Sequence, residues 1–175
     1  LFVVIDPATF AGRNVNISRS LRRGVEITLK GRYGTWLDGF LNYTYTKSTF
    51  ETDVLFFSGQ VRKGDEFPLV PNHRVGVGLS LHPTKRLTVS LFGNYVGRQF
   101  LLNDEPNQFK KLNDYFVLNG KVSYNWKDFT AYIMANNLAN QKFSTFGIVG
   151  GFPAQPFLIP FPTTTVFAGL TFRYN

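Results

Sequence analysis

Few side chains in this 175-residue sequence have the type and spacing that catalysis or metal binding requires. The two histidines, His73 and His82, fall at opposite ends of one predicted strand, which separates them by about 30 Å and prevents them from sharing an ion. No His-x-x-x-His pair or acid-rich calcium loop is present, and the absence of cysteine excludes a thiolate site. We therefore predict neither a metal site nor a cofactor.

Hydrolytic chemistry has one weak candidate. Ser80 and His82 share a face of the same predicted strand, which is the arrangement of a nucleophile beside a general base. No acid is evidently placed next to them in the sequence, and no Gly-x-Ser-x-Gly motif occurs. We therefore predict no catalytic residues and a protein that is not an enzyme.

Non-covalent capture of a ligand is better supported, because rings and cations recur in the segments between the predicted strands. Such groups suit planar anionic ferric chelates or sugar rings. The candidate ligand-binding residues are Phe56, Phe57, Arg62, Arg98, Gln99, Phe100, Phe152 and Phe157, with Lys63, Lys110, Lys111 and Phe146 in the same segments. For any one of them, the alternative is packing within the loops together with contact to lipopolysaccharide phosphate.

The elements that position these groups show a period of two residues. Apolar Val75, Val77, Leu79 and Leu81 alternate with Arg74, Gly76, Gly78 and Ser80, and this period indicates a β-strand with unlike faces. About eight strands are predicted in this way. They cover residues 1–5, 16–31, 36–50, 73–82, 87–97, 114–126, 129–138 and 163–174.

The connections between these strands alternate in length. Residues 32–35, 83–86 and 127–128 form short turns, whereas residues 6–15, 51–72, 98–113 and 139–162 form long loops. Short turns on one rim and long loops on the other are typical of transmembrane β-barrels. Charges inside the strands avoid the aliphatic side, as expected if that side faces lipid. The fold class predicted is therefore all-β, an antiparallel transmembrane β-barrel segment.

Composition supports the same class. The formal net charge is +8, but the cations are scattered and many lie at strand ends, such as Arg23 and Arg86, which suggests a solvated rim. No nucleic-acid-binding pattern accompanies them, so no nucleic acid partner is expected. No run of eighteen apolar residues occurs, so a spanning helix is not predicted. The first residue is not methionine, which suggests a piece of a longer precursor.

Six short motifs follow one another along the chain. They are Arg23-Gly24-Val25-Glu26, Asn42-Tyr43-Thr44-Tyr45-Thr46, Val70-Pro71-Asn72-His73-Arg74, Tyr95-Val96-Gly97-Arg98, Asp114-Tyr115-Phe116-Val117-Leu118 and Asn136-Asn137-Leu138. In this order they resemble the C-terminal part of TonB-dependent outer-membrane receptors along nearly the whole chain. Two departures from the family pattern occur, because residues 139–140 replace the usual Phe-Asp and the chain ends in Asn175 where such barrels usually end in phenylalanine. We expect that a terminal phenylalanine is missing.

The resemblance implies a plugged barrel of about 22 strands in the bacterial outer membrane. Residues 1–175 would be its C-terminal part, without the plug domain and the earlier strands. Such a receptor imports a scarce nutrient, such as a ferric siderophore, cobalamin or a glycan, with energy delivered by TonB through the absent N-terminal region. The expected partners are outer-membrane lipid and lipopolysaccharide, the protein's own plug and remaining strands, TonB and a small-molecule substrate.

The resemblance also gives a role to charges on the polar side of the strands. Glu26, Lys30, Arg74, Lys121 and Arg173 would face the lumen, where they pair with one another or hold the plug. Two other interpretations stay open at this point. One is a complete eight-stranded outer-membrane barrel that acts as an adhesin or envelope anchor, and the other is a soluble eight-stranded carrier with an apolar cavity.

Overall fold

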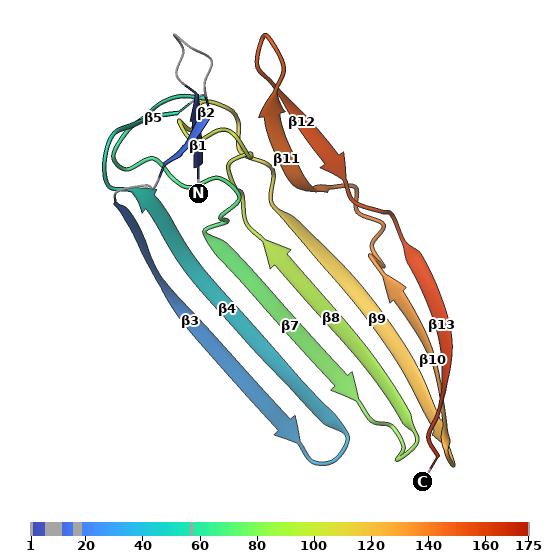
Figure 1. Ribbon diagram of the computed structural model, residues 1–175. Coiled ribbons are helices and arrows are strands. Elements are labelled where there is room, and N and C mark those ends of the chain that lie inside the picture. Colours follow the sequence, from blue (N-terminus) through green and yellow to red (C-terminus); the bar gives the residue numbers. More distant parts are fainter. Residues whose placement is uncertain (1, 6–11, 16–18, 57, 175) are drawn as a thin grey trace.

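The computed structural model describes residues 2–5, 12–15, 19–56 and 58–174, and every regular element in these ranges is a β-strand. Seven strands form one antiparallel sheet in the order β13-β10-β9-β8-β7-β4-β3 (Figure 1). None of the described residues forms a helix long and apolar enough to cross a membrane. The seven strands are β3 (Ser20–Tyr33), β4 (Leu37–Phe50), β7 (His73–Leu81), β8 (Leu87–Val96), β9 (Tyr115–Trp126), β10 (Phe129–Asn136) and β13 (Thr165–Phe172).

Sequence neighbours pair along most of this sheet, and the short turns all lie at one end of it (Figure 1). The turn between β9 and β10 has only Lys127 and Asp128, and Lys127 takes a positive φ of 50°. The loops at the opposite end contain three separate two-stranded hairpins. These are β1 (Phe2–Ile5) with β2 (Gly12–Val15), β5 (Val54–Phe56) with β6 (Gly59–Val61), and β11 (Ser144–Gly150) with β12 (Gln155–Pro160).

The prediction that residues 1–5 form a strand of the barrel wall is wrong. β1 pairs with β2 from Phe2↔Val15 to Ile5↔Gly12, and this hairpin stands among the long loops beside β5 (Figure 1). A wall strand needs about 9–11 residues to cross the hydrocarbon layer, and β1 has four. The edge strand of the seven-stranded sheet is therefore β3, which has fourteen residues.

The register of the sheet gathers the aliphatic positions of all seven strands on one face. Leu29 pairs with Leu41, Leu41 with Val77, and the same face continues through Leu79, Leu91 and Gly120 to β10 and β13. Between the rims this face carries only aliphatic, glycine and aromatic residues. Many of them are exposed: Val25, Ile27, Leu29, Val77, Leu79, Leu91, Val122, Ile133, Val166 and Leu170. We call it the apolar face.

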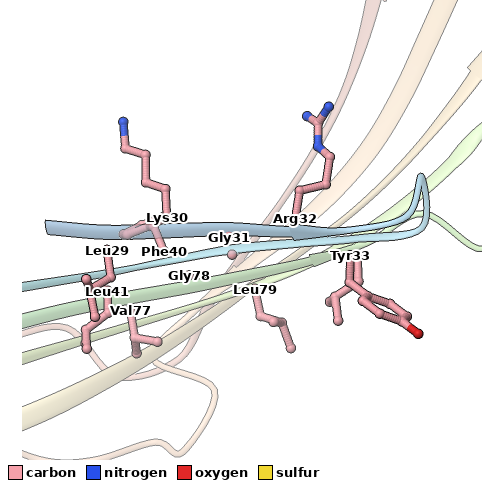
Figure 2. A pocket seen from close by; sticks show the side chains of 12 residues that line it. Leu29, Lys30, Gly31, Arg32, Tyr33, Phe40, Leu41, Val77, Gly78 and Leu79 are labelled. Atoms are coloured by element: carbon pink, nitrogen blue, oxygen red, sulfur yellow. The ribbon is translucent and has the colours of Figure 1, made fainter.

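The alternate positions form the polar face. Figure 2 shows Lys30 and Arg32 projecting from one side of β3, while Leu29, Leu41, Val77 and Leu79 project from the other side of the sheet. Cross-strand pairing from Glu26 to Thr44 and Arg74 continues the polar face across β4 and β7. The alternation predicted for β7 is thus present in the sheet.

Phe40 is an apolar residue on the polar face, and its neighbour explains its place. It is the cross-strand partner of Gly78, and its ring occupies the space where a Cβ at residue 78 would lie. Tyr132 covers its partner Gly169 in the same way. Glycine opposite a ring lets the aromatic side chain lie flat along the sheet. At Gly78 the space of a side chain is therefore filled by a ring from the neighbouring strand.

Candidate functional site in the loops above the polar face

The long loops pack on one another rather than standing apart. In the β4–β7 loop, Phe50, Phe56 and Val61 form a buried cluster, with the Phe50 ring stacked 4.0 Å from that of Phe67. In the β8–β9 loop, Leu101 and Leu112 pack against Val149 of β11. Burial of these apolar side chains stabilises the β4–β7 loop internally and joins the β8–β9 loop to β11.

Hydrogen bonds join neighbouring loops across this end of the sheet. Asn107 receives the backbone N–H of Glu66 at its side-chain oxygen (2.7 Å) and donates from its amide to the Glu66 carbonyl (2.9 Å). The Leu102 amide donates to the Gly147 carbonyl (2.9 Å), and the Val149 amide donates back to the Leu102 carbonyl (2.8 Å). The loops after β4, β8 and β10 therefore behave as one connected cap.

Asp104 organises the tight part of the β8–β9 loop. Its carboxylate is 1% exposed and accepts the amides of Gln108 (2.8 Å) and Phe109 (3.1 Å). Burial raises the pKa of Asp104 above its ordinary value, and the two amide bonds oppose that rise only partly. Asp104 therefore holds the loop conformation and is not available to a ligand.

Asn137 fixes the end of β10 and the start of the loop that follows. Its side chain is fully buried, takes the amide of Gln141 (3.0 Å) and donates to the carbonyls of Gln141 and Pro162. Its own amide donates to Asn119 on the polar face (3.0 Å). A positive φ of 53° suits asparagine better than most other residues. These contacts give a structural reason for the Asn136-Asn137-Leu138 motif.

Two hollows lie at the loop end, one within the cap and one between the cap and the sheet, and both include Phe143 of the β10–β13 loop. The first, of about 480 Å³, is the basic hollow, because three lysines contribute to it. Its lining is Leu101, Lys110, Lys111, Leu112, Asn113, Asp114, Gln141, Lys142, Phe143, Ser144, Pro156 and Leu158. Three lysines in one hollow favour the binding of an anionic group. The Nζ atom of Lys111 also lies 3.0 Å from Glu66 Oε2 and 4.4 Å from the centroid of the Phe100 ring.

The second hollow, of about 490 Å³, is the aromatic hollow on the polar face. The Phe143 ring stacks on Tyr115 (centroids 4.4 Å apart) and on Phe161 (4.9 Å), which forms a row of three rings. The residues that line this hollow also include three asparagines and no charged side chain. The lining is Asn94, Tyr115, Val117, Asn119, Asn136, Phe143, Thr145, Phe161, Pro162, Thr165 and Phe167.

Of the loop residues predicted from sequence, Lys110 and Lys111 line the basic hollow, and none of the eight candidate ligand-binding residues lines either hollow. Phe56 and Gln99 are buried within the cap, and Phe57 lies outside the described residues. The other five lie apart from one another. Arg62 is exposed and its backbone amide donates to Asp65, Arg98 forms an ion pair with Asp114, and Phe100 lies beneath the Lys111 ammonium. Phe152 is fully exposed at the β11–β12 turn, and Phe157 on β12 is half exposed. Phe143 and Lys142 were not singled out, because their neighbours come from three distant segments.

The lumen-facing residues predicted from sequence lie on or beside the polar face. Glu26 and Arg74 are both cross-strand partners of Thr44, Lys30 pairs with Phe40, and Lys121 lies 4.8 Å from the Tyr132 ring centroid. The backbone amide of Arg173, which follows β13, donates to the Asp128 carbonyl (2.9 Å). Among the described residues, none of these five side chains has an ionic partner within 4.0 Å.

An acid does lie beside His82, contrary to the expectation from sequence. This acid is Asp38, whose Oδ1 lies 2.6 Å from Nε2 of His82. The other ring nitrogen of His82, Nδ1, lies 3.1 Å from Thr88 Oγ1, so both ring nitrogens have a hydrogen-bond partner at the short-turn rim. Ser80 contacts Ser90 instead (2.9 Å between hydroxyl oxygens). His73, at the other end of β7, contacts the Tyr43 hydroxyl (3.0 Å). The described residues contain no group of three or more metal ligands.

Comparisons with known proteins agree with this architecture. A siderophore receptor, PiuA from Acinetobacter baumannii, superposes with a TM-score of 0.75 at 20% identity, over 98% of this chain and 24% of its own. The ferric yersiniabactin uptake receptor FyuA from Yersinia pestis gives 0.68 at 19% identity, over 86% and 23%. A mutant of the ferric enterobactin receptor PfeA from Pseudomonas aeruginosa gives 0.67 at 18% identity, over 89% and 22%.

The chain thus spans about a quarter of the length of these receptors. No curated protein sequence matches it. The family model described as "TonB dependent receptor-like, beta-barrel" matches residues 2–138, which is most of the chain. With its all-β structure and its antiparallel wall of long strands, the chain belongs to the TonB-dependent receptor-like β-barrel family.

Proposed function

We propose that this chain is part of an outer-membrane active transporter that imports a ferric siderophore bearing aromatic rings and negative charge. The observation that carries this proposal is the pair of adjoining hollows that share Phe143, one with lysines and one with stacked rings. Rings offer stacking surface to a planar chelate, and ammonium groups offset its charge. Cobalamin and glycans, which were also expected from the resemblance, match this combination less well.

The two faces of the sheet fit a wall between lipid and lumen. The apolar face would contact lipid, since an Arg or Lys there costs about 2–4 kcal/mol at the bilayer midplane. The polar face would face the lumen and a plug domain, for which Glu26, Arg74 and Lys121 offer unpaired charges. The neighbours' names, which specify siderophore or ferric-chelate receptors, support the substrate class.

The test uses the full-length receptor in a bacterial strain that lacks it. Uptake of radioactive iron is measured with a ferric catecholate, and uptake of labelled cobalamin and of a labelled oligosaccharide is measured in parallel. Phe143→Ala removes the ring shared by both hollows, so we expect iron uptake at limiting chelate to fall about ten-fold. Phe129→Ala, beside the short turn between β9 and β10 and outside both hollows, is the matched control and should leave uptake unchanged.

Two results would contradict the proposal. One is uptake of cobalamin or oligosaccharide without uptake of any ferric chelate. The other is normal iron uptake by the Phe143→Ala receptor when its amount in the outer membrane equals that of the unmodified protein.

A further inference from the structure

The basic hollow contains one lysine that already has a carboxylate partner. Lys111 lines the hollow, and its Nζ lies 3.0 Å from Oε2 of Glu66, which belongs to the β4–β7 loop. The side chains of Lys111 and Glu66 are only 30% and 22% exposed, so water and salt screen this pair less than an ion pair at the open surface. Lys111 therefore presents less net charge to a ligand than an unpaired lysine does.

The other charged residues of the hollow differ from Lys111 in exposure and pairing. Lys110 and Lys142 are exposed, and in the part of the chain that the structure describes neither has a carboxylate within 4.0 Å. The acid in the lining, Asp114, forms an ion pair with Arg98 (3.2 Å). Lys110 and Lys142 are thus the cations of the hollow that no acid of the chain compensates.

Main-chain hydrogen bonds fix the positions of Glu66 and Lys111. The Glu66 amide donates to the side-chain oxygen of Asn107 (2.7 Å), and the Asn107 side chain donates to the Glu66 carbonyl (2.9 Å). Next to Lys111, the Leu112 amide donates to the Gln99 carbonyl (2.8 Å). None of these bonds uses the Glu66 carboxylate, so the loops place this group beside Lys111 without depending on its charge.

We propose that Glu66 is a specificity-determining residue that sets the ligand charge preferred by the basic hollow. It compensates Lys111 and leaves Lys110 and Lys142 to attract the ligand, so the hollow suits a weakly anionic chelate better than a highly charged one. Glu66 is not among the lining residues, and it therefore acts on the ligand through Lys111 rather than by contact. The inference rests on the proposed function, which assigns the basic hollow to the anionic part of a ferric chelate.

The experiment measures the Kd of two ferric chelates of different charge for the purified full-length receptor in detergent. One is the trianionic ferric complex of a synthetic tris-catecholamide, and the other is the uncharged ferric complex of a synthetic tris-hydroxamate. Glu66→Gln removes the charge and keeps the main-chain bonds to Asn107. We expect it to bind the trianionic complex about five-fold more tightly, because Lys111 is then uncompensated, and to bind the uncharged complex as before.

The neighbouring acid provides the matched control. Asp65→Asn removes the same charge one residue away, where the carboxylate accepts the Arg62 amide (2.7 Å), and it should change either Kd by less than about two-fold. High salt should reduce the gain in Glu66→Gln, since screening weakens the interaction of charges. An equal change for both chelates would overturn the proposal, because it would indicate a disturbed loop. Unchanged or weaker binding of the trianionic complex by Glu66→Gln would overturn it as well.

A measurement without ligand separates this inference from the proposed function. If neither chelate binds the unmodified receptor, the proposed function is contradicted, and the pairing of Lys111 is judged from the rate at which acetic anhydride acylates each lysine. Peptide mass spectrometry should show slower acylation of Lys111 than of Lys110, because Glu66 holds its ammonium and the Phe100 ring lies 4.4 Å away. Glu66→Gln should narrow this difference. Equal acylation of Lys111 in both receptors would overturn the inference.

Discussion

The two faces of the seven-stranded sheet are built from the same strands and differ in the charge and polarity of their side chains. Between the rims the apolar face has no charged side chain, and many of its aliphatic residues are exposed. The polar face, one residue out of phase, carries Glu26, Lys30, Arg74 and Lys121 together with hydroxyl and amide groups. In a water-soluble sheet the aliphatic face is covered by other parts of the chain, and here it is not.

This difference supports the proposal that the two faces contact different solvents. Exposed aliphatic surface of this extent on a water-soluble protein marks an interaction site or an aggregation hazard. Against lipid it carries no such cost. The backbone groups of β4, β7, β8, β9 and β10 have a neighbouring strand on both sides, whereas β3 and β13 are the two edges of the sheet.

The largest expected effect comes from placing a charge on the apolar face. Leu79→Arg should lower the free energy of unfolding by about 2–4 kcal/mol or block assembly, because the guanidinium would lie in hydrocarbon. Ser80→Arg changes the neighbouring residue on the polar face and should be clearly milder. Refolding of both full-length variants into lipid vesicles measures the difference. Two equal penalties, or a larger one for Ser80→Arg, would refute the assignment of the faces.

The wall was predictable from sequence because its signal is repeated. The stretches of period two predicted β4, β7 and β9 within one residue at each end. The failure at residues 1–5 has a physical cause: a short apolar run fits a hairpin as well as a wall strand, and only its pairing with residues 12–15 decides between them. The hairpin β11–β12 was missed for a similar reason, since it is short and lies within a segment predicted as a long loop.

The candidate site was much less predictable. Phe56 and Gln99 have side chains of the kind expected to contact a ligand, but packing of the loops on one another buries both. Phe143 and Tyr115 are distant in sequence and meet only because β9 and the β10–β13 loop are adjacent in space. Alternation of residue types reports which face a strand residue takes, whereas the burial of a loop residue depends on which other loop covers it.

Glycines on the polar face give the second prediction, of intermediate size. At Gly78 a methyl group would collide with the Phe40 ring, whereas at Gly76 its nearest neighbours are Asn42 and Asn94 at 3.7–3.9 Å. Gly78→Ala should therefore destabilise the protein by about 1–3 kcal/mol, and Gly76→Ala should change stability little. Thermal unfolding in detergent compares the two. A tolerated Gly78→Ala would show that the Phe40 ring does not need its place across the sheet.

The smallest expected effect is the pH dependence of two acids in the loops. The pKa of Asp114 is lowered, so its contribution to stability is present above its ordinary pKa and is lost as pH falls through the lowered value. The pKa of Asp104 is raised, so its contribution is present below the ordinary pKa and is lost as pH rises through the raised value. The two acids therefore respond to acid in opposite directions.

Hydrogen exchange resolves this difference between the loops. Acidification should increase protection of the amides of Gln108 and Phe109, which bind Asp104, after correction for the intrinsic exchange rate. Asp104→Asn should abolish that response. A decrease in protection on acidification would show that the carboxylate, rather than the carboxylic acid, is the form favoured at Asp104.

The most direct test of the opposite solvents of the two faces is solvent access at two adjacent residues. Spin labels are attached singly at residues 79 and 80 of the full-length receptor in lipid vesicles, and collisions with oxygen and with a water-soluble nickel chelate are measured. A lipid-facing apolar face predicts high oxygen and low chelate access at residue 79, with the order reversed at residue 80 or both low where a plug covers it. Equal access of both residues to oxygen, or chelate access at residue 79, would contradict the account.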